Sequence, residues 1–336
     1  MAHAASEWLK VFDDGLYVEP ADLWIDPARP KHRAVITHGH GDHARPGHAH
    51  VLATPETAAI MRARYGDEAG GQIQEQVYGR SVSMGGARLA FQPAGHVLGS
   101  AQIVLEHAGS RVVISGDYKR RGDPTCTAFI PVACDVFVTE ATFALPVFRH
   151  PPIERELDKL FDSMARFPER SHLIGAYALG KAQRLIAEIR ARGYDRPIFL
   201  HGALKPLCRL YQDHGIDLGP LDDATAANKS KLAGEIVLAP PSATRDKWAR
   251  RMDDPVVAHA SGWMTVRQRA KQRLAELPLI VSDHADWDEL TQTVQDVGCS
   301  DLWVTHGRED ALVHWATQRG IAAQALSLVG REEEEG

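Results

Sequence analysis

The sequence predicts a layered α/β protein with two domains, in which polar side chains collect where buried strands end. Short apolar runs in the first half of the chain end repeatedly in Asp, Glu or His, and ligands gather at such strand ends in layered α/β folds. Between residues 150 and 276, helical patterns alternate with short apolar runs, which is typical of a second α/β unit. The 336 residues are 44% hydrophobic, which is enough to fill two cores of ordinary size.

The first 140 residues are expected to form mainly strands joined by polar loops. Strands are expected near residues 23–25, 34–36, 51–53, 87–94, 101–106, 111–115 and 135–139. Thr54 and Pro55 have the pattern of an N-cap followed by proline at the first helical position, so a helix is expected through Tyr65 and is ended by Gly66. The residues that follow the strands are Asp26, His38, His40, Asp42, His43, His96, Asp117 and Glu140.

The rest of the chain alternates between helices and strands. Helices are expected near residues 153–166, 181–192, 204–213 and 265–276, with strands near 172–176, 197–200 and 235–239. A buried strand at 279–282 then ends at Asp283 and His284, and a helix follows at 287–297. A strand at 302–305 ends likewise at His306, before a helix at 309–318.

Composition excludes several classes of protein. No apolar run approaches the roughly 18 residues of a membrane span, and the start lacks a basic region followed by an apolar signal core, so a cytoplasmic protein without a membrane partner is expected. Four cysteines form no Cys-x-x-Cys pair, which indicates neither a zinc finger nor a disulfide framework. Any bound metal must therefore be held by His and carboxylate side chains.

The net charge of −6 hides a division along the chain. Residues 150–283 contain 21 Lys and Arg and 17 Asp and Glu, whereas the rest of the chain contains 17 Lys and Arg and 27 Asp and Glu. Part of the acidic excess is a run of four glutamates at 332–335, expected to be a solvated tail. A basic middle segment is compatible with an anionic substrate, but the overall charge argues against indiscriminate coating of nucleic acid.

The segment Thr-His-Gly-His-Gly-Asp-His at residues 37–43 predicts a metal site. His38 and His40 can bind one ion, and Asp42 and His43 point to a second position close by. Each position needs further ligands, and the strand-end residues His96, Asp117 and His284 can supply them. Imidazole and carboxylate without thiolate suit zinc, manganese or iron, and two ions about 3.5–4 Å apart favour hydrolysis at a phosphoryl or acyl centre.

This pattern resembles a known superfamily. His38-x-His40-x-Asp42-His43, preceded by an aspartate and followed by the Gly-His96 loop and Ser-Gly-Asp117, is similar to the metallo-β-lactamase superfamily in order and spacing. The basic insert before Ser-Asp-His284-Ala-Asp resembles the β-CASP domain of its nucleic-acid-cutting branch. Three further stretches strengthen the match, namely residues 177–183, 261–264 and 305–307. The short length of the chain and the sequence of residues 36–47 resemble most closely the bacterial ligase-associated DNA exonucleases.

The resemblance covers about residues 15–328 and implies both fold and domains. The expected fold is an αββα metallo-β-lactamase sandwich with an inserted β-CASP α/β domain. The sandwich would comprise residues 1–148 and 277–330, the β-CASP domain residues 149–276, and the acidic tail residues 331–336.

The resemblance also implies roles for individual residues. It places His38, His40 and His96 on one ion, Asp42, His43 and His284 on the other, and Asp117 between the two. Asp26 would hold the His loop, since a ligating histidine needs an oriented partner. Glu140 would orient a general acid or the nucleophile, and His306 would face the scissile phosphate. The histidine that protonates the leaving oxygen in this family has no clear counterpart, although His201 and His259 are candidates.

Several residues of the insert are candidates for nucleic-acid contact. They are Lys181, Arg184, Ser261, Trp263 and Arg267. Lys181 and Arg184 lie at the start of a helix that can bind phosphate, but they also fit the solvated face of an amphipathic helix. Trp263 lies among cationic residues and can stack on unpaired bases.

The expected function is hydrolysis of phosphodiester bonds with two divalent ions, Zn²⁺ or Mn²⁺. The resemblance implies a DNA exonuclease that acts from the 5′ end on DNA that is single-stranded or has free ends, in repair alongside an ATP-dependent DNA ligase and a helicase. A non-catalytic binding subunit is disfavoured because all seven expected metal ligands are present, and two further alternatives remain open. One is an RNA-processing nuclease of the β-CASP family, because no residue distinguishes ribose from deoxyribose. The other is a thioester or ester hydrolase, which would not need an insert of this size.

Overall fold

The computed structural model describes residues 5–328 and divides into two compact units. The first unit comprises the described residues up to Arg149 and those from His284 onward, and the second runs from His150 to Asp283. The acidic tail expected at residues 331–336 lies outside the described residues. Within the described chain, no helix has the length and apolar character to cross a membrane.

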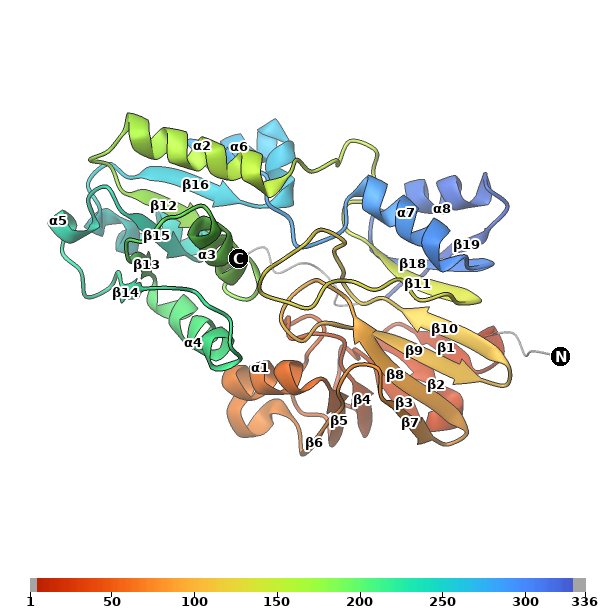
Figure 1. Cartoon of the computed structure of the whole chain (residues 1–336). Helices are drawn as coiled ribbons and strands as arrows, with labels where there is room; N and C mark the ends of the chain where they lie inside the picture. The colour runs from red at the N-terminus through yellow and green to blue at the C-terminus, as the bar shows by residue number, and fades with distance from the viewer. Residues whose placement is uncertain (1–4, 329–336) are drawn as a thin grey trace. The chain divides into compact units, whose positions relative to one another are not determined.

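The first unit contains a six-stranded sheet in the order β1-β2-β3-β4-β5-β6 (Figure 1). Its strands are β1 (Leu9–Phe12), β2 (Gly15–Val18), β3 (Leu23–Ile25), β4 (Arg33–Val35), β5 (His50–Ala53) and β6 (Gln72–Glu75). The pairs among β1, β2 and β3 are antiparallel, and those from β3 to β6 are parallel. Helix α1 (Pro55–Tyr65) follows β5, and its cap is confirmed, because the Thr57 amide donates to Thr54 Oγ1 over 3.2 Å.

A second, seven-stranded sheet has the order β19-β18-β11-β10-β9-β8-β7. Its strands are β7 (Ser81–Met84), β8 (Ala87–Pro93), β9 (Ala101–His107), β10 (Ser110–Ile114), β11 (Val136–Ala141), β18 (Asp301–Gly307) and β19 (Ala322–Ala325). Two helices from the C-terminal part of the chain accompany it, α7 (Trp287–Val297) and α8 (Glu309–Thr317). The strands expected at 87–94, 101–106 and 302–305 are thus confirmed, whereas β7 and β19 were not predicted.

The two sheets pack face to face, with helices on both outer faces. Leu16 and Ile25 of the first sheet share one buried cluster with Phe91 and Ile103 of the second. A second cluster packs α1, through Met61, against the outer face of the first sheet. A third cluster joins α7 and α8 to the outer face of the second sheet. This is the αββα sandwich of the metallo-β-lactamase fold.

The second unit is a parallel α/β sheet in the order β14-β13-β15-β12-β16-β17. Its strands are β12 (His172–Gly175), β13 (Ile198–Leu200), β14 (Leu221–Asp223), β15 (Ile236–Ala239), β16 (Val256–Ala260) and β17 (Leu277–Leu279). Its helices are α2 (Ile153–Arg166), α3 (Lys181–Ala191), α4 (Lys205–Asp213), α5 (Lys229–Leu232) and α6 (Arg267–Gln272). This unit is the inserted α/β domain that the resemblance implies.

Two boundaries differ from the prediction. The strand expected at 279–282 lies instead at Leu277–Leu279 and pairs with β16, so it is an edge strand of the insert. The first unit therefore resumes at His284 rather than at residue 277. The long helix expected at 265–276 is the shorter α6, because a 3₁₀ turn at Gly262–Thr265 precedes it and Leu274 has a positive φ of 50°. An apolar run alone does not show which of two sheets a strand joins.

Candidate metal centre

The polar residues expected at strand ends lie together in the first unit. The loop after β4 contributes His38, His40, Asp42 and His43, and the β8–β9 loop contributes His96. Asp117 follows β10, and Glu140 lies in β11. His284 lies in the segment before α7, and His306 lies in β18. Strand ends deliver all of these residues except His284, which explains how residues up to 268 positions apart form one site.

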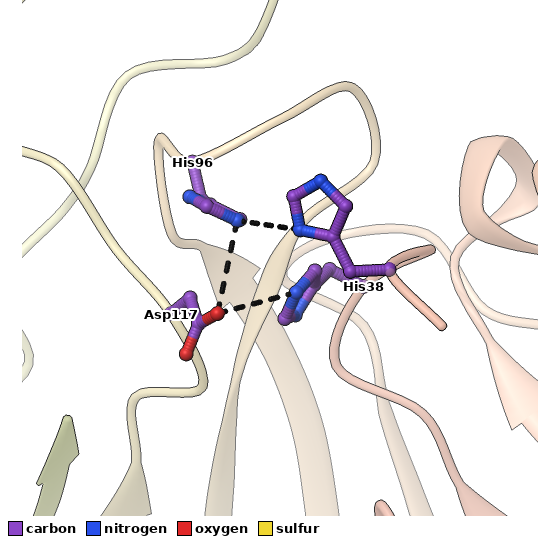
Figure 2. Close-up of side chains that lie close together, drawn as sticks. His38, His96 and Asp117 are labelled. Atoms are coloured by element: carbon purple, nitrogen blue, oxygen red, sulfur yellow. Dashed lines mark hydrogen bonds and ion pairs between the residues drawn. The ribbon is translucent and has the colours of Figure 1, made fainter. Parts of the chain in front are cut away.

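The first donor group contains His38, His40, His96 and Asp117, whose donor atoms lie within 4.8 Å of one another. Figure 2 shows His38, His96 and Asp117 pointing toward a common point. Asp117 Oδ2 lies 3.5 Å from His38 Nε2 and 3.8 Å from His96 Nε2, and His96 Nε2 lies 3.0 Å from His40 Nδ1. This is the set predicted for the first ion.

The second donor group contains Asp42, His43 and His306. His43 Nε2 lies 3.5 Å from Asp42 Oδ2 and 3.5 Å from Asp117 Oδ2, so Asp117 faces both groups. His306 reaches the site because the β11–β18 pairing passes from Glu140 opposite Thr305 to Ala141 opposite Gly307. His306 is the extra residue of this bulge, with a φ of 61°, and a bulge redirects the side chain it carries.

His284 differs from its predicted role as a ligand of the second ion. It lies with Glu140 and Asp117, and its Nδ1 donates to Glu140 Oε2 over 2.9 Å. Glu140 Oε1 accepts from the Tyr118 amide over 2.8 Å, so both oxygens of Glu140 have partners. Both ring nitrogens of His306, in contrast, are buried without a hydrogen-bond partner. His306 lies with Asp42 and His43, the other two residues predicted for the second ion, whereas His284 lies in a separate group with Glu140, so His306 fits the second ion better.

Asp26 holds the His loop in the manner expected. Its Oδ1 accepts from the Thr37 amide over 2.8 Å, and its Oδ2 accepts from Thr37 Oγ1 over 2.6 Å. His43 Nδ1 also donates to Asp26 Oδ2 over 2.8 Å, which leaves Nε2 directed at the second donor group. The contact of Thr37 with Asp26 was not predicted from the sequence. The feature that could have indicated it is the position of Thr37 between the strand and the first histidine.

Burial and mutual charge shift the pKa values of the metal-free cluster. Burial lowers the pKa of His38 well below its usual range, and burial together with His43 lowers that of His306 to about 3. Burial also acts to lower the pKa of His43, but Asp117 and the other nearby carboxylates outweigh it and raise it to about 9. Burial raises the pKa of Asp117 to about 7, against the opposing effect of His43. His38 and His306 are therefore neutral at pH 7.

The residues present fit divalent metal ions. Among the described residues, the buried atoms without a hydrogen-bond partner include His38 Nε2, His43 Nε2, Asp117 Oδ1 and both nitrogens of His306. Such groups are costly to bury unless something binds them. Two ligands about 2.1 Å from one tetrahedral ion lie about 3.4 Å apart, which matches the 3.5 Å separations around Asp117. Nitrogen and oxygen donors without thiolate suit Zn²⁺ and Mn²⁺.

Metal binding is expected to release protons. In the metal-free protein His43 is protonated below a pH of about 9, and Asp117 is partly protonated near pH 7, because their pKa values are raised. Both must lose their protons to bind metal, so the apparent affinity should rise between pH 6 and pH 9. Isothermal titration calorimetry of Zn²⁺ or Mn²⁺ in buffers of different ionisation enthalpy measures the released protons directly. Affinity independent of pH with no proton release would contradict this assignment.

Gly39, between two of the predicted ligands, fixes the loop against α1. A Cβ at Gly39 would lie 2.5 Å from Ile60 Cγ2, and Arg64 Nη1 donates to the Gly39 carbonyl over 2.8 Å. Gly39→Ala is therefore expected to lower the free energy of unfolding by about 1–3 kcal/mol and to weaken metal binding. Combining it with Ile60→Ala should cost less than the sum of the two changes, as a double-mutant cycle by chemical denaturation would show.

Gly122 offers a matched control in the same unit. A Cβ there would meet no atom within 4 Å. Gly122→Ala should change the free energy of unfolding by less than about 0.5 kcal/mol. An equal effect of the two substitutions would show that packing against Ile60 does not position the His loop.

The proposed cationic contacts of the insert divide into two kinds. Lys181 and Arg184 are buried, at 4% and 3% exposure, and both pair with Asp283, at 3.2 and 3.3 Å. They are therefore internal ion-pairing residues rather than a surface for phosphate, which corrects the prediction. Trp263 is half-buried, with the Arg269 guanidinium 3.9 Å from its ring centroid, and Arg267 is exposed.

Ser261 and the two candidate histidines of the insert have local structural roles. Ser261 Oγ caps the turn by accepting from the Trp263 amide over 3.3 Å. His201 Nδ1 accepts from the Ala203 amide over 3.1 Å. His259 is buried, its Nε2 lies 3.3 Å from Thr244 Oγ1, and burial together with Arg273 lowers its pKa to about 4. Neither histidine is placed as a proton donor by these contacts.

Several known proteins are similar to this chain in sequence. A probable DNA ligase of Opitutus terrae is 28% identical over 326 residues, which are 95% of this chain and 31% of the ligase. Cleavage and polyadenylation specificity factor subunit 3 of Dictyostelium discoideum is 34% identical over 119 residues, 34% of this chain and 15% of that protein. Endoribonuclease YSH1 of Mycosarcoma maydis is 30% identical over 231 residues, 54% of this chain and 25% of that protein.

One similar solved structure is that of a protein of unknown function from Enterococcus faecalis V583. The two superpose with a TM-score of 0.57 at 14% sequence identity, over 81% of this chain and 74% of the other. At this identity the similarity shows the fold alone. No family model matches the chain. The chain has the metallo-β-lactamase fold with an inserted α/β domain, and its sequence is similar to β-CASP nucleases such as the polyadenylation factor subunit and endoribonuclease YSH1. The chain spans about a third or less of the length of these curated relatives.

Proposed function

We propose that this chain is a metal-dependent nuclease that hydrolyses DNA phosphodiester bonds. The observation that carries the proposal is the pair of donor groups between which Asp117 lies, 3.5 Å from His38 and from His43, beside the hydrogen-bonded pair of Glu140 and His284. Two divalent ions at such a site activate water and stabilise negative charge on a phosphoryl group. The first ion would be held by His38, His40, His96 and Asp117, and the second by Asp42, His43, His306 and Asp117.

The remaining residues orient groups and move a proton. Glu140 accepts from His284 Nδ1 and fixes the ring, and His284 Nε2 would be the atom that donates a proton to the leaving oxygen. Burial acts to raise the pKa of Glu140, but the interaction with His284 outweighs it and lowers the pKa, so Glu140 stays charged. Asp26 fixes the His loop through Thr37 and His43. His284 would thus take the proton-donor role, for which no clear candidate could be predicted from the sequence.

DNA is the substrate we favour. Similarity to a protein named as a probable DNA ligase extends over 95% of this chain, whereas similarity to the polyadenylation factor subunit covers 34%. We propose an exonuclease that acts from the 5′ end of single-stranded DNA, in repair with an ATP-dependent ligase and a helicase as partners. RNA processing is the second candidate, because relatives named as endoribonucleases match up to 54% of the chain.

The insert would contribute contacts to the nucleic acid through its exposed cations. Arg267 is exposed, and Arg269 lies over the Trp263 ring, an arrangement suited to phosphate binding beside a stacked base. Lys181 and Arg184 are excluded from this proposal because Asp283 pairs with both.

End-labelled DNA and RNA strands of one sequence test the proposal. The purified chain is incubated with strands labelled at either end, in Zn²⁺, Mn²⁺ or Mg²⁺, and the products are resolved by length. Release of short products from the 5′ end of DNA supports the full proposal. Faster cleavage of RNA would favour RNA processing, and hydrolysis of a thioester or ester but of neither nucleic acid would overturn the nuclease assignment.

A further inference from the structure

Lys119 is a fully buried lysine that the proposed function does not use. Its side chain has 0% exposure, and that of its partner Asp123 has 2%. Lys119 Nζ donates to Asp123 Oδ2 over 2.7 Å and to the His96 carbonyl over 3.1 Å. A buried ion pair is commonly no more stabilising than apolar residues of similar volume, so its presence calls for a further role.

Asp123 is itself fixed in a turn. Its Oδ1 accepts from the Thr125 amide over 2.8 Å and from Thr125 Oγ1 over 2.6 Å. The carboxylate oxygen that pairs with Lys119 is therefore held in place from the other side. Because both the carboxylate and the lysine backbone are fixed, the ammonium group has little freedom to leave the His96 carbonyl.

The His96 loop is held on both sides of its histidine. The His96 amide donates to Ser100 Oγ over 3.0 Å, and its carbonyl accepts from Lys119. The Lys119 amide also donates to the Ala94 carbonyl over 3.2 Å. Gly95 has a φ of 73°, and a Cβ there would lie 2.5 Å from the Lys119 carbonyl oxygen. The loop and the Lys119 backbone are thus in direct contact.

We propose that Lys119 is a positioning residue that aims the His96 imidazole at the first donor group. A charged donor makes a stronger hydrogen bond to a carbonyl than a neutral one, and contacts of this kind orient metal ligands. Lys119 follows Asp117 by two residues, so one short segment supplies a ligand directly and orients a second. The inference rests on the metal centre of the proposed function and is independent of the substrate.

The test removes the charge pair without leaving a lone buried charge. In the variant Lys119→Met/Asp123→Asn, the asparagine retains the oxygen that accepts from Thr125, and both buried charges are gone. We expect its melting temperature to stay near that of the wild type. The affinity for the first equivalent of Co²⁺ should fall by about 10–100-fold, with a changed d–d absorption spectrum, because His96 is no longer held.

Arg120→Met is the matched control. Arg120 is the neighbouring cation, and it bonds to Asp296 Oδ2 at 2.5 Å and Thr293 Oγ1 at 3.2 Å on α7. This variant should bind Co²⁺ with the wild-type affinity and spectrum. Wild-type Co²⁺ binding by the double variant, or equal losses in both variants, would overturn the positioning role of Lys119.

Two further outcomes are distinguishable. If the double variant does not fold, Lys119→Leu/Asp123→Asn is measured in the same way, and an unchanged Co²⁺ affinity and spectrum there overturn the inference. Wild-type protein that binds Co²⁺ but cleaves no nucleic acid would overturn the proposed activity and leave the Lys119 comparison valid. Wild-type protein that binds no metal would overturn both.

Discussion

Asp117→Asn is expected to reduce phosphodiester cleavage by at least about 10³-fold and to lower the metal content of the purified chain. The Asp117 Oδ2 atom lies 3.5 Å from both His38 Nε2 and His43 Nε2, so one carboxylate serves both donor groups. Asparagine keeps the shape of the side chain but loses the negative charge that would help to hold the metal ions. Cleavage rates and elemental analysis of metal per chain measure the two effects.

Asp288→Asn controls for loss of a carboxylate elsewhere in the same unit. Asp288 lies on α7, is 60% exposed and pairs with Arg149, and exposed pairs contribute at most about 1 kcal/mol. This variant should retain its metal and its activity. Cleavage at the wild-type rate by Asp117→Asn would contradict the shared-ligand assignment.

Substitution of the two C-terminal histidines is expected to separate metal binding from proton transfer. His306→Ala removes a donor of the second group and should lower the metal content, because His306 lies with Asp42 and His43. His284→Ala should retain both metal ions and lower kcat by about 10²–10⁴-fold, the usual contribution of a general acid. The difference follows from the groups in which the two histidines lie, because His306 is beside Asp42 and His43 whereas His284 is beside Glu140 and Asp117.

The same elemental analysis and rate measurements decide between the two assignments. Loss of metal in His284→Ala, with full metal content in His306→Ala, would restore the ligand set expected from the sequence. A leaving group of low pKa, such as 4-nitrophenol, needs little protonation. His284→Ala should therefore lose less activity on such a phosphodiester than on DNA, whereas His306→Ala should lose activity on both.

Much of the site could be predicted because its ligands are local in sequence or end buried strands. Four of the ligands lie within six residues, namely His38, His40, Asp42 and His43. His96 lies between two strands, and Asp117 follows another, all recognisable from their apolar runs. Parallel and neighbouring strands bring such ends to one edge whatever the loops between them. The first donor group was therefore accessible from sequence and resemblance.

The division of roles between His284 and His306 could not be predicted. Both follow apolar runs and precede helices, so the sequence pattern is the same. The distinction depends on the bulge that places His306 outside the β11–β18 register and on the Glu140 contact of His284. Both are tertiary features that no local pattern encodes.

The positions of several basic residues could not be predicted either, because they also depend on tertiary contacts. Lys181 and Arg184 were expected at the surface, but each pairs with Asp283, about 100 positions further along the chain. Lys119 lies in a run of three cations, a pattern usually found on solvated surfaces, and yet it is fully buried. A charged side chain is assigned to the interior only when its partner is known.

The requirement for two metal ions per chain is the central claim, and titration of metal into chelated protein tests it most directly. Metal-free chain is mixed with end-labelled single-stranded DNA, and Mn²⁺ or Zn²⁺ is added in steps of a fraction of an equivalent while cleavage is measured. The two donor groups around Asp117 predict no cleavage without metal and full activity only as the second equivalent binds. Cleavage by the metal-free chain, or full activity after a single equivalent, would contradict the account.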